Sequence, residues 1–535
     1  MKTRTTEIIF LSATVIIAFF TKGCSQPAPP QKPPANISLN STIGSLTEML
    51  SPGPVAIEGY GLIGGLSGTG SPDCPPDVRD YLEKYIKKQL PDQETDIDNL
   101  MSSNDIAVVR LQGLIPPMAN QNEAFDIKVS ALPGAQTTSL EDGWLYKTEL
   151  KVAGSFGMAM KTLAAAEGPV FIDKSNPSDV NKKSGYILGG GRVINEYRVD
   201  LALRQPDYRV AALIRNRINE RFGSEMANAV SESFIELKIP PKYRMQKERF
   251  ILIVRAMYLN QTSDTARERI ITFIQKLAVG ENKGEAEIAL ETIGNEAIDK
   301  LAALLNSSNE EVRFRAARCM LNLGNDKGLE TLRQIAADKN SSRRLEALSA
   351  ITASAKRNDA AVVARRLLQD ENLDIRLAAY ESLRKLEDIV ISEKLIGRSF
   401  YLEQISQTEY KTIYASRSGK PRIALLGAPI RCNDNIFVES GDGNITINAP
   451  AGQKYVSIIR KNPARPDMII QAKSSFEVGD IIQTLCEESA KRTDERRSGL
   501  NVSYAEMAAL LQQMCDKGVI KAEFRAGPLP KIGPQ

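Results

Sequence analysis

The sequence predicts an α+β protein in which a mixed α/β module is split by an inserted α-helical repeat array. Short β-branched runs between glycine and proline turns dominate residues 42–262. A stretch rich in Ala, Leu, Arg and Glu and without strand signals follows, and strand-like alternation returns after residue 390. With 42% hydrophobic and 25% charged residues, the 535-residue chain can form several ordinary cores. The segments that we expect are 1–23, 24–41, 42–262, 263–390 and 391–535.

The first segment is typical of a signal peptide for export. Lys2 and Arg4 precede an apolar run, Ile8 to Phe20, that is shorter than the ~20 residues of a membrane span. The run ends just before Cys24 in a sequence that resembles the cleavage box of bacterial lipoproteins, although positions 21 and 22 depart from its usual residues. We therefore expect acylation of Cys24. A plain signal peptide and an uncleaved spanning helix are the alternatives.

The proline-rich segment 24–41 predicts an extended tether. Ser25 is not the acidic residue that retains some lipoproteins at the inner membrane, so we expect the lipid anchor to lie in the outer membrane. Export would place the five remaining cysteines in an oxidising compartment, where one of them must stay unpaired. The sequence does not fix the pairing. Cys486 and Cys515 share a segment and are the first candidates for a disulfide.

Residues 42–262 show the periodicities of both strands and helices. Alternating or β-branched runs predict four strands, at Ile106–Leu111, Phe125–Val129, Phe234–Ile239 and Phe250–Val254. Apolar stripes with a 3.6-residue period predict helices at Asp77–Gln89 and Tyr208–Phe222.

Residues 263–390 contain internal repeats. Similar segments align around Ala316, Ala347 and Ala379, which lie 31 and 32 residues apart, and an earlier copy begins at Ala286. This spacing resembles HEAT-like repeats, in which a small residue lets two helices approach and each pair stacks on the next. An irregular helical bundle is the alternative. If the array is inserted into a loop, its two ends should lie close together.

The C-terminal segment, 391–535, returns to strand-like alternation. Tyr410 to Tyr455 alternates around a turn at Gly441–Asn444, and Tyr504 to Cys515 has the stripe of an amphipathic helix. We expect a short disordered tail after Pro528.

The composition excludes large classes of function. Without histidine, the chain cannot use Ser/His/Asp or Cys/His catalysis or a histidine-ligated metal. With 69 basic against 65 acidic residues, its net charge of +4 is too dilute to attract nucleic acid. Gly59 to Gly64 satisfies the dinucleotide pattern GxGxxG, but no helix can begin in the Gly- and Pro-rich residues that follow. We expect no catalytic residues, cofactor, metal or small-molecule substrate.

The same glycine segment resembles the opening of the flagellar P-ring protein family. Further matches follow in the family's order: a strand that ends in a double proline, the segment from Phe125 to Leu132, and a closing segment from Tyr504 to Phe524 that begins with the last helix. The residues that carry the resemblance are Gly59, Tyr60, Gly61, Gly64, Gly65, Gly68, Gly70, Pro116, Pro117 and Asp126.

This resemblance implies a structural protein without enzyme activity. It implies a homo-oligomeric ring in the periplasm, around the flagellar rod, with the rod and the outer-membrane ring proteins as partners. The family has neither the helical repeats nor a lipid anchor, so a second hypothesis is an envelope lipoprotein scaffold whose HEAT-like repeats bind a protein partner. An unusual enzyme is a third.

Overall fold

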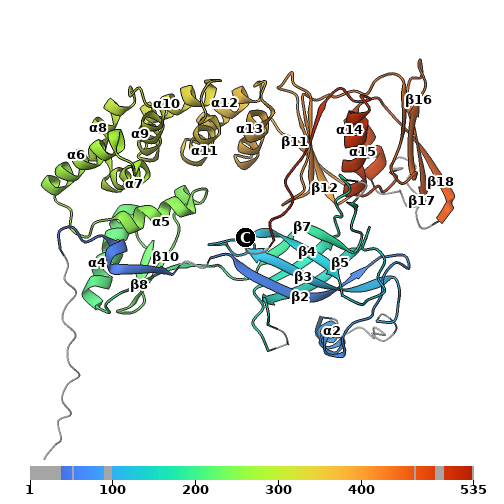
Figure 1. The fold of residues 1–535 in the computed structure, drawn as a ribbon, viewed down its shortest axis with the longest axis horizontal. Helices are drawn as coiled ribbons and strands as arrows, with labels where there is room; N and C mark the ends of the chain where they lie inside the picture. The colour runs from blue at the N-terminus through green and yellow to red at the C-terminus, as the bar shows by residue number, and fades with distance from the viewer. Residues whose placement is uncertain are drawn as a thin grey trace, which may run out of the picture.

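The computed structural model shows a chain folded around three β-rich bodies and a row of helices (Figure 1). The structure describes residues 38–50, 53–89, 99, 101–155, 157, 159–176, 179–462, 465–487 and 499–532. The predicted signal peptide and Cys24 lie outside these residues, as does most of the predicted tether. Among the described residues, no helix has both the length and the apolar character of a membrane span.

A closed six-stranded barrel, with strand order β2-β3-β4-β7-β6-β5, forms the first body. Its strands are β2 (Val55–Gly64), β3 (Ile106–Ile115), β4 (Ala124–Ala131), β5 (Trp144–Val152), β6 (Ala164–Pro169) and β7 (Ser184–Val193). Alternate residues of each strand point inward, so Ile57, Val109 and Ile127 are buried inside the barrel. Helix α2 (Pro76–Gln89) packs on the outside through Val78, Tyr81 and Leu82.

We call the second body the N-lobe. Its sheet has the order β1-β8-β10-β9. Its elements are α1 (Ile43–Leu46), β1 (Thr47–Leu50), β8 (Val199–Leu203), α4 (Tyr208–Phe222), β9 (Ala227–Ala229), β10 (Phe234–Leu237) and α5 (Lys247–Ala256). Leu201 and Ile235 pack with residues of both α4 and α5 in one buried cluster.

The helix α5 corrects a sequence prediction. Phe250–Val254 was expected as a strand because it is a run of aromatic and β-branched residues, but it lies inside α5. Phe250, Ile253 and Val254 are buried at i, i+3 and i+4, while Leu252 is 47% exposed. The run therefore covers one face of a helix, and tertiary packing overrides its β-propensity. The other three predicted strands and both predicted helices of this region are confirmed.

The array consists of two layers of helices, and consecutive helices of the chain alternate between the layers and run antiparallel. Helices α7, α9, α11 and α13 contact one another in succession, and α6, α8, α10 and α12 form the other layer (Figure 1). The bounds are α6 (Ser263–Val279), α7 (Lys283–Ile293), α8 (Ile298–Leu304), α9 (Glu310–Asn322), α10 (Asp326–Ala337), α11 (Arg344–Ser354), α12 (Arg357–Leu367) and α13 (Leu373–Lys385). The buried repeat alanines, Ala316, Ala347 and Ala379, lie on α9, α11 and α13, as the repeat alignment predicted.

The asparagines that precede α9, α11 and α13 do not all have the same role. Asn309 and Asn372 cap α9 and α13, because each Oδ1 accepts hydrogen bonds from two backbone N–H groups of the first turn. The guanidinium groups of Arg313 and Arg376 then bind carbonyls of the preceding turn. Asn340 lies before the equivalent helix but does not cap it.

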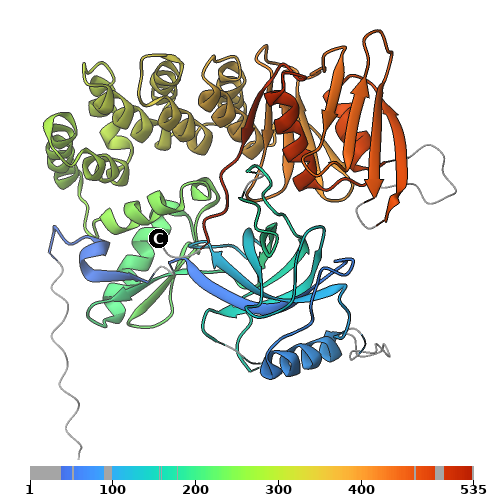
Figure 2. The ribbon, with the colours of Figure 1, turned by 45° about the vertical axis from the view of Figure 1, so that its right-hand side comes forward.

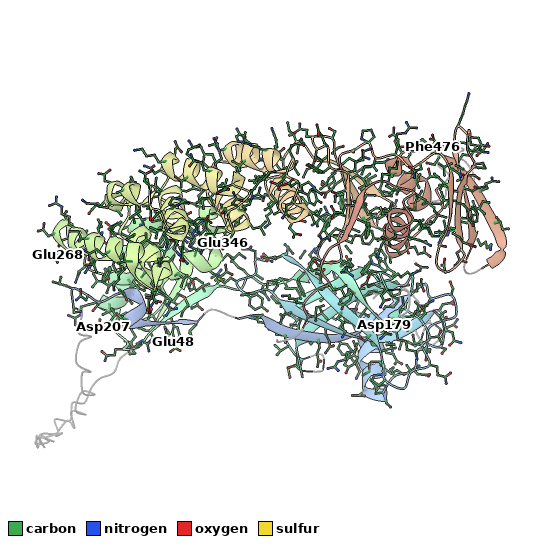
Figure 3. All side chains as sticks on the ribbon, turned by 45° about the horizontal axis from the view of Figure 1, so that its top comes forward. Glu48, Asp179, Asp207, Glu268, Glu346 and Phe476 are labelled. Atoms are coloured by element: carbon green, nitrogen blue, oxygen red, sulfur yellow. The ribbon has the colours of Figure 1, made fainter. Side chains whose placement is uncertain are left out.

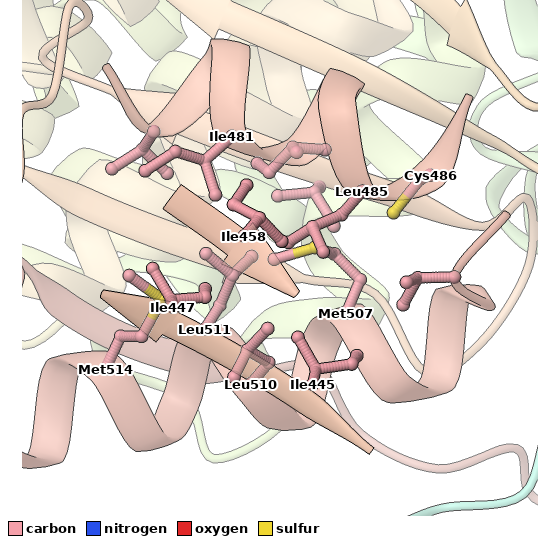
Figure 4. Packing of buried hydrophobic residues seen from close by; sticks show 14 of the residues in the cluster. Ile445, Ile447, Ile458, Ile481, Leu485, Cys486, Met507, Leu510, Leu511 and Met514 are labelled. Carbon is pink, nitrogen blue, oxygen red and sulfur yellow. The ribbon is translucent and has the colours of Figure 1, made fainter. Parts of the chain in front are cut away.

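The third body, the C-lobe, places two helices between two sheets. One sheet has the order β11-β12-β14-β13-β19 and the other β15-β16-β17-β18. The helices α14 and α15 bury Ile481, Leu485, Leu510 and Leu511 against the second sheet (Figure 4). The bounds are β11 (Ser392–Ile396), β12 (Phe400–Ile405), β13 (Thr412–Ala415), β14 (Arg422–Leu426), β15 (Ile436–Glu439), β16 (Ile445–Ala449), β17 (Val456–Asn462), β18 (Arg465–Ser474), α14 (Val478–Cys486), α15 (Tyr504–Asp516) and β19 (Glu523–Ala526).

The array spans the distance between the N-lobe and the C-lobe. Helix α6 lies at the N-lobe end of the row and α13 lies beside the C-lobe (Figures 1 and 2). The two ends therefore do not meet, contrary to the expectation for a simple loop insertion. Ile405, Ala424 and Leu426 of the C-lobe belong to the same buried cluster as Ile375 and Tyr380 of α13. The helices thus complete the core of the C-lobe sheet.

Candidate functional site

The glycine segment forms the seam at which the barrel closes. Strand β2 pairs with β3 along all ten residues, but it pairs with β5 only near its two ends. Between those ends β5 crosses β2 so closely that a Cβ on Gly61 would lie 2.4 Å from Oγ1 of the buried Thr148. A Cβ on Gly59 would lie 2.6 Å from the carbonyl oxygen of Glu149. Glycine is therefore required by the close approach of two strands.

The rest of the glycine segment turns the chain away from the barrel. Gly65 and Gly68 have φ of +81° and +84°, and a Cβ on Gly70 would lie 2.1 Å from the carbonyl oxygen of Ile106. Gly64 ends β2, and Tyr60 packs beside the cluster under α2. The next helix, α2, begins at Pro76, twelve positions after Gly64. The helix that a dinucleotide fingerprint needs does not begin in the glycine run.

The double proline ends β3. Pro116 and Pro117 follow Ile115, the last residue of the strand, and neither can donate a ladder hydrogen bond. Met118, the next residue, has φ of +53°, and its carbonyl accepts a hydrogen bond from Nζ of Lys247 at 2.7 Å. This turn therefore joins the barrel to α5 of the N-lobe.

Asp126 joins the barrel to the C-lobe. Its carboxylate accepts hydrogen bonds from the backbone N–H of Gly189, at 2.6 Å, and of Gly419, at 2.9 Å. Both glycines have left-handed φ, and a Cβ on Gly189 would lie 3.1 Å from the backbone of Gly419. Burial raises the pKa of Asp126, although the two N–H groups act in the opposite direction.

Further contacts extend this joint. Arg417, beside Gly419, binds Asp173 at 2.9 Å and the carbonyl of Gly527 at 2.6 Å. Phe171 of the barrel packs against Tyr504 of α15, with ring centroids 5.8 Å apart. Phe171 and Leu188 of the barrel therefore belong to the apolar cluster of the C-lobe, and the polar contacts of Asp126 and Arg417 lie beside it.

A cluster of charged side chains fills the other part of the same joint. Lys174 pairs with Glu141 of the barrel and lies 3.9 Å from Glu506 of α15. Arg460 of β17 lies 3.5 Å from the same Glu506. Burial, followed by the charge of Asp142, raises the pKa of Glu506.

Two further polar clusters join the array to its neighbours. At the N-lobe end, the fully buried Glu287 of α7 binds Arg249 of α5 at 2.7 Å and Arg315 and Arg318 of α9. Arg249 also pairs with Glu291.

At the C-lobe end, Arg376 of α13 lies 3.1 Å from Glu523 of β19. The hydroxyl of the buried Tyr380 donates a hydrogen bond to Glu403 of β12 and accepts one from Arg422 of β14 at 3.0 Å. Charge-bearing contacts therefore hold the array at both ends.

The two cysteines predicted as a disulfide are both free in the structure. Cys486 is buried on α14, and Cys515 is partly buried on α15. Burial, followed by the charge of Cys515, raises the pKa of Cys432. The structure therefore gives no support to the pairing of Cys486 with Cys515. The predicted lipidation site, Cys24, lies outside the described residues.

The arrangement is that of several joints between the bodies of the fold. Within the described residues, no group of three or more acidic or cysteine side chains could hold a metal ion. The structure does not bring the predicted residues together: Gly59 and Gly61 lie at the barrel seam, and Gly65, Gly68 and Gly70 lie in the turn after it. Pro116 and Pro117 lie at the joint to the N-lobe, and Asp126 lies at the joint to the C-lobe.

Sequence reasoning missed the charged residues of the joints, Glu287, Arg249, Lys174 and Glu506. No local pattern distinguishes them from exposed charges, because their partners are distant in sequence.

Comparison with known proteins identifies two parts of the chain. Residues 43–273 match the family described as flagellar P-ring protein, and residues 279–352 match HEAT repeats. A flagellar P-ring protein of Thermotoga maritima is 30% identical over 210 residues, which are 37% of this chain and 60% of that protein. One from Helicobacter pylori is 25% identical over 241 residues, and one from Aliarcobacter butzleri 27% over 232. They cover 44% and 42% of this chain, and the chain spans 65% and 61% of their lengths.

Proposed function

Because residues 43–273 match the flagellar P-ring protein family, we propose that this chain is a subunit of the ring around the flagellar rod. The single observation that supports this best is the match itself, which covers both the barrel and the N-lobe. The chain would act as a structural component, with the rod and the outer-membrane ring proteins as its neighbours. It would reside in the periplasm and support motility.

The glycine seam and the joints fit a load-bearing role. A bushing around a rotating rod must keep its shape, and a barrel closed by direct backbone contact offers few degrees of freedom. The array adds a brace between the N-lobe and the C-lobe, because polar clusters and apolar packing hold it at both ends. Its ends are thus occupied by the chain's own lobes. The alternative, in which the repeats recruit a protein partner, would have to use the remaining faces of the helices.

The proposal is tested by deleting the gene and examining the cells and their basal bodies. We expect loss of swimming, with electron micrographs of purified basal bodies lacking the ring between the rod's base and the outer membrane. Expression of the wild-type chain should restore both. Intact rings and normal swimming in the deletion strain would refute the proposal.

The membrane anchor is a separate part of the proposal. It rests on the apolar run that ends before Cys24. Several acyl chains would hold the protein firmly, whereas one chain gives only marginal binding.

A further inference from the structure

The last strand, β19, lies where three bodies of the fold meet. It pairs in parallel with β13 at the end of the C-lobe sheet. None of its four residues is buried, whereas three of the four residues of β13 are. The dark red chain leaves the C-lobe after this strand and runs toward the barrel (Figures 1 and 2). Glu346 on the array, Phe476 on the C-lobe and Asp179 on the barrel mark the three bodies in Figure 3. Because so short and exposed a strand has little stability of its own, its contacts outside the sheet decide whether it stays in place.

The two sides of β19 contact different bodies. Phe524 packs beside the apolar cluster of the C-lobe, while the residues on either side of it reach helix α13 of the array. Glu523 accepts a hydrogen bond at 3.1 Å from Nη2 of Arg376, and Arg525 lies 3.8 Å from Asp374. The side chain of Arg376 is only 3% exposed, whereas those of Arg525 and Asp374 are 47% and 68% exposed. The pair of Glu523 and Arg376 is therefore the stronger contact, because solvent screens the other pair from both sides.

Arg376 has Glu523 as the only carboxylate within 4 Å in the described part of the chain. Its other acceptors are uncharged: the carbonyls of Asp370 and Glu371, and Oγ1 of Thr412 on β13. Its Nε is buried and has no hydrogen-bond partner among the described residues. Without Glu523, a buried guanidinium group would remain uncompensated beside the start of β13.

The other end of β19 is joined to the barrel through Arg417. Nε of Arg417 donates a hydrogen bond to the carbonyl of Gly527, at 2.6 Å. Its Nη1 donates to Asp173 at 2.9 Å and to Ser175 at 3.0 Å, in the segment that follows β6. The N–H of Gly527 donates to the carbonyl of Ala415 on β13 at 2.8 Å. One guanidinium group thus connects the end of β19 with the barrel.

We propose that β19 is a latch that holds the array, the C-lobe and the barrel together, and that its release loosens the contacts with α13 and Arg417 at the same time. Glu523 begins the four-residue strand and Gly527 follows its end, so the two contacts stabilise one bound state of a single short segment. The apolar packing of α13 on the C-lobe, through Ile375 and Leu426, does not involve β19. Release of the latch therefore loosens the joints without unfolding the bodies. The inference concerns a single chain and does not depend on the proposed ring.

Hydrogen exchange of the full chain, followed by mass spectrometry, tests the latch. Glu523→Gln removes the charge that faces Arg376 and keeps the shape of the side chain, and Arg417→Gln removes the link to the barrel at the other end. Arg525→Gln is the matched control, because it removes an exposed charge pair from the same strand. Circular dichroism checks that each variant folds. The amides of α5, in the N-lobe, provide the reference for opening of the whole fold.

We expect Glu523→Gln to speed exchange about three- to tenfold at Gly527 and at residues 173–175, where the substitution itself removes no contact. Arg417→Gln should have the reciprocal effect on the amide of Glu523, which donates to the carbonyl of Lys411, and on the start of α13. The double variant should show the product of the two effects at both ends, because both contacts stabilise the same closed state. Arg525→Gln should change exchange less than twofold, and α5 should exchange at the same rate in all variants.

Three outcomes would overturn the latch. Faster exchange confined to the end that carries the substitution would mean that β19 frays from its two ends independently. Equal effects of Glu523→Gln and Arg525→Gln would contradict the role of Arg376. An equal rise of exchange in α5 would mean that the whole fold opens rather than one strand. The gene-deletion experiment measures the ring function separately, so the latch and the ring can fail independently.

Discussion

Replacing Glu287 with Gln keeps the shape of the side chain but removes its charge. We expect this change to weaken the attachment of the array to the N-lobe. Glu287 is fully buried and receives hydrogen bonds from Arg249, Arg315 and Arg318. Removing one partner of a buried ion pair costs about 3 to 5 kcal/mol, because the other charges stay buried without compensation. Here three guanidinium groups would face a neutral amide, and Glu291 would remain as the nearest carboxylate for Arg249.

The assay uses two signals that come from different bodies. The array contributes most of the helical signal in circular dichroism, whereas the single tryptophan, Trp144, lies on β5 of the barrel. With a urea dependence of ~2 kcal/mol per molar, the helical transition should move down by about 1.5 to 2.5 M. The fluorescence transition should move less.

Glu311 provides a matched control, because it binds Arg315 as Glu287 does. Glu311 binds Arg315 at 2.9 Å but is 30% exposed, so Glu311→Gln should cost only about 0 to 1 kcal/mol. If Glu287→Gln shifts the helical transition no more than Glu311→Gln does, the argument for a buried clamp is refuted.

The pH dependence gives an independent check. Burial alone would raise the pKa of Glu287, but Arg249 and Arg318 outweigh it and hold the pKa below its ordinary value. The stability that the ionised carboxylate contributes is therefore complete above the unfolded-state pKa and is lost as the pH falls through the lower folded-state pKa. Below about pH 4.5, the difference between wild type and Glu287→Gln should shrink.

Three other substitutions test the seam, the joint and the anchor. Gly61→Val should cost about 1 to 3 kcal/mol or more in a melting experiment, because Thr148 cannot move aside inside the barrel, whereas Gly441→Ala, with no atom near its Cβ, should be close to neutral. Asp126→Ala should leave the N–H groups of Gly189 and Gly419 without their acceptor and lower the free energy of unfolding by about 1 to 3 kcal/mol. Faster proteolysis between the barrel and the C-lobe would reveal the weakened joint. Cys24→Ser should move the protein from the detergent phase to the aqueous phase and abolish labelling by a fatty-acid probe; unchanged partitioning would indicate an uncleaved helix.

Elements with a strong local period were predictable from the sequence. The stripe of Tyr208–Phe222 gave α4 within its bounds, and the repeat alanines located three inner helices of the array. The run at Phe250–Val254 was misread, because five apolar residues in a row fit a buried strand and a packed helix equally well. Only the contact with α4 and the N-lobe sheet decides between them.

The candidate site, like the fold, was predictable from the sequence only in part. The glycine-rich segment 59–70 was conspicuous in the sequence, and the structure places Gly59 and Gly61 where β5 crosses β2. The partner strand could not be predicted, since Thr148 is almost ninety residues away from Gly61. Asp126 was singled out in the sequence only by the resemblance to the family. Its two glycine partners lie 63 and 293 residues away in the chain. Such long-range pairs carry no local pattern.

The array changes how the two flanking parts of the chain can move. In a chain with a flexible insertion, the N-lobe and the C-lobe would be related only through the barrel. Here the C-lobe is fixed to the barrel by Asp126 and Arg417 and to the array by Tyr380 and Arg376, while the array is fixed to the N-lobe by Glu287. Barrel, C-lobe, array and N-lobe therefore form a closed circuit of contacts. Opening one joint strains the others, so the N-lobe and the C-lobe hold each other in one relative orientation. A ring of identical subunits requires such an orientation, because a variable angle between the contact surfaces of a subunit would yield open chains.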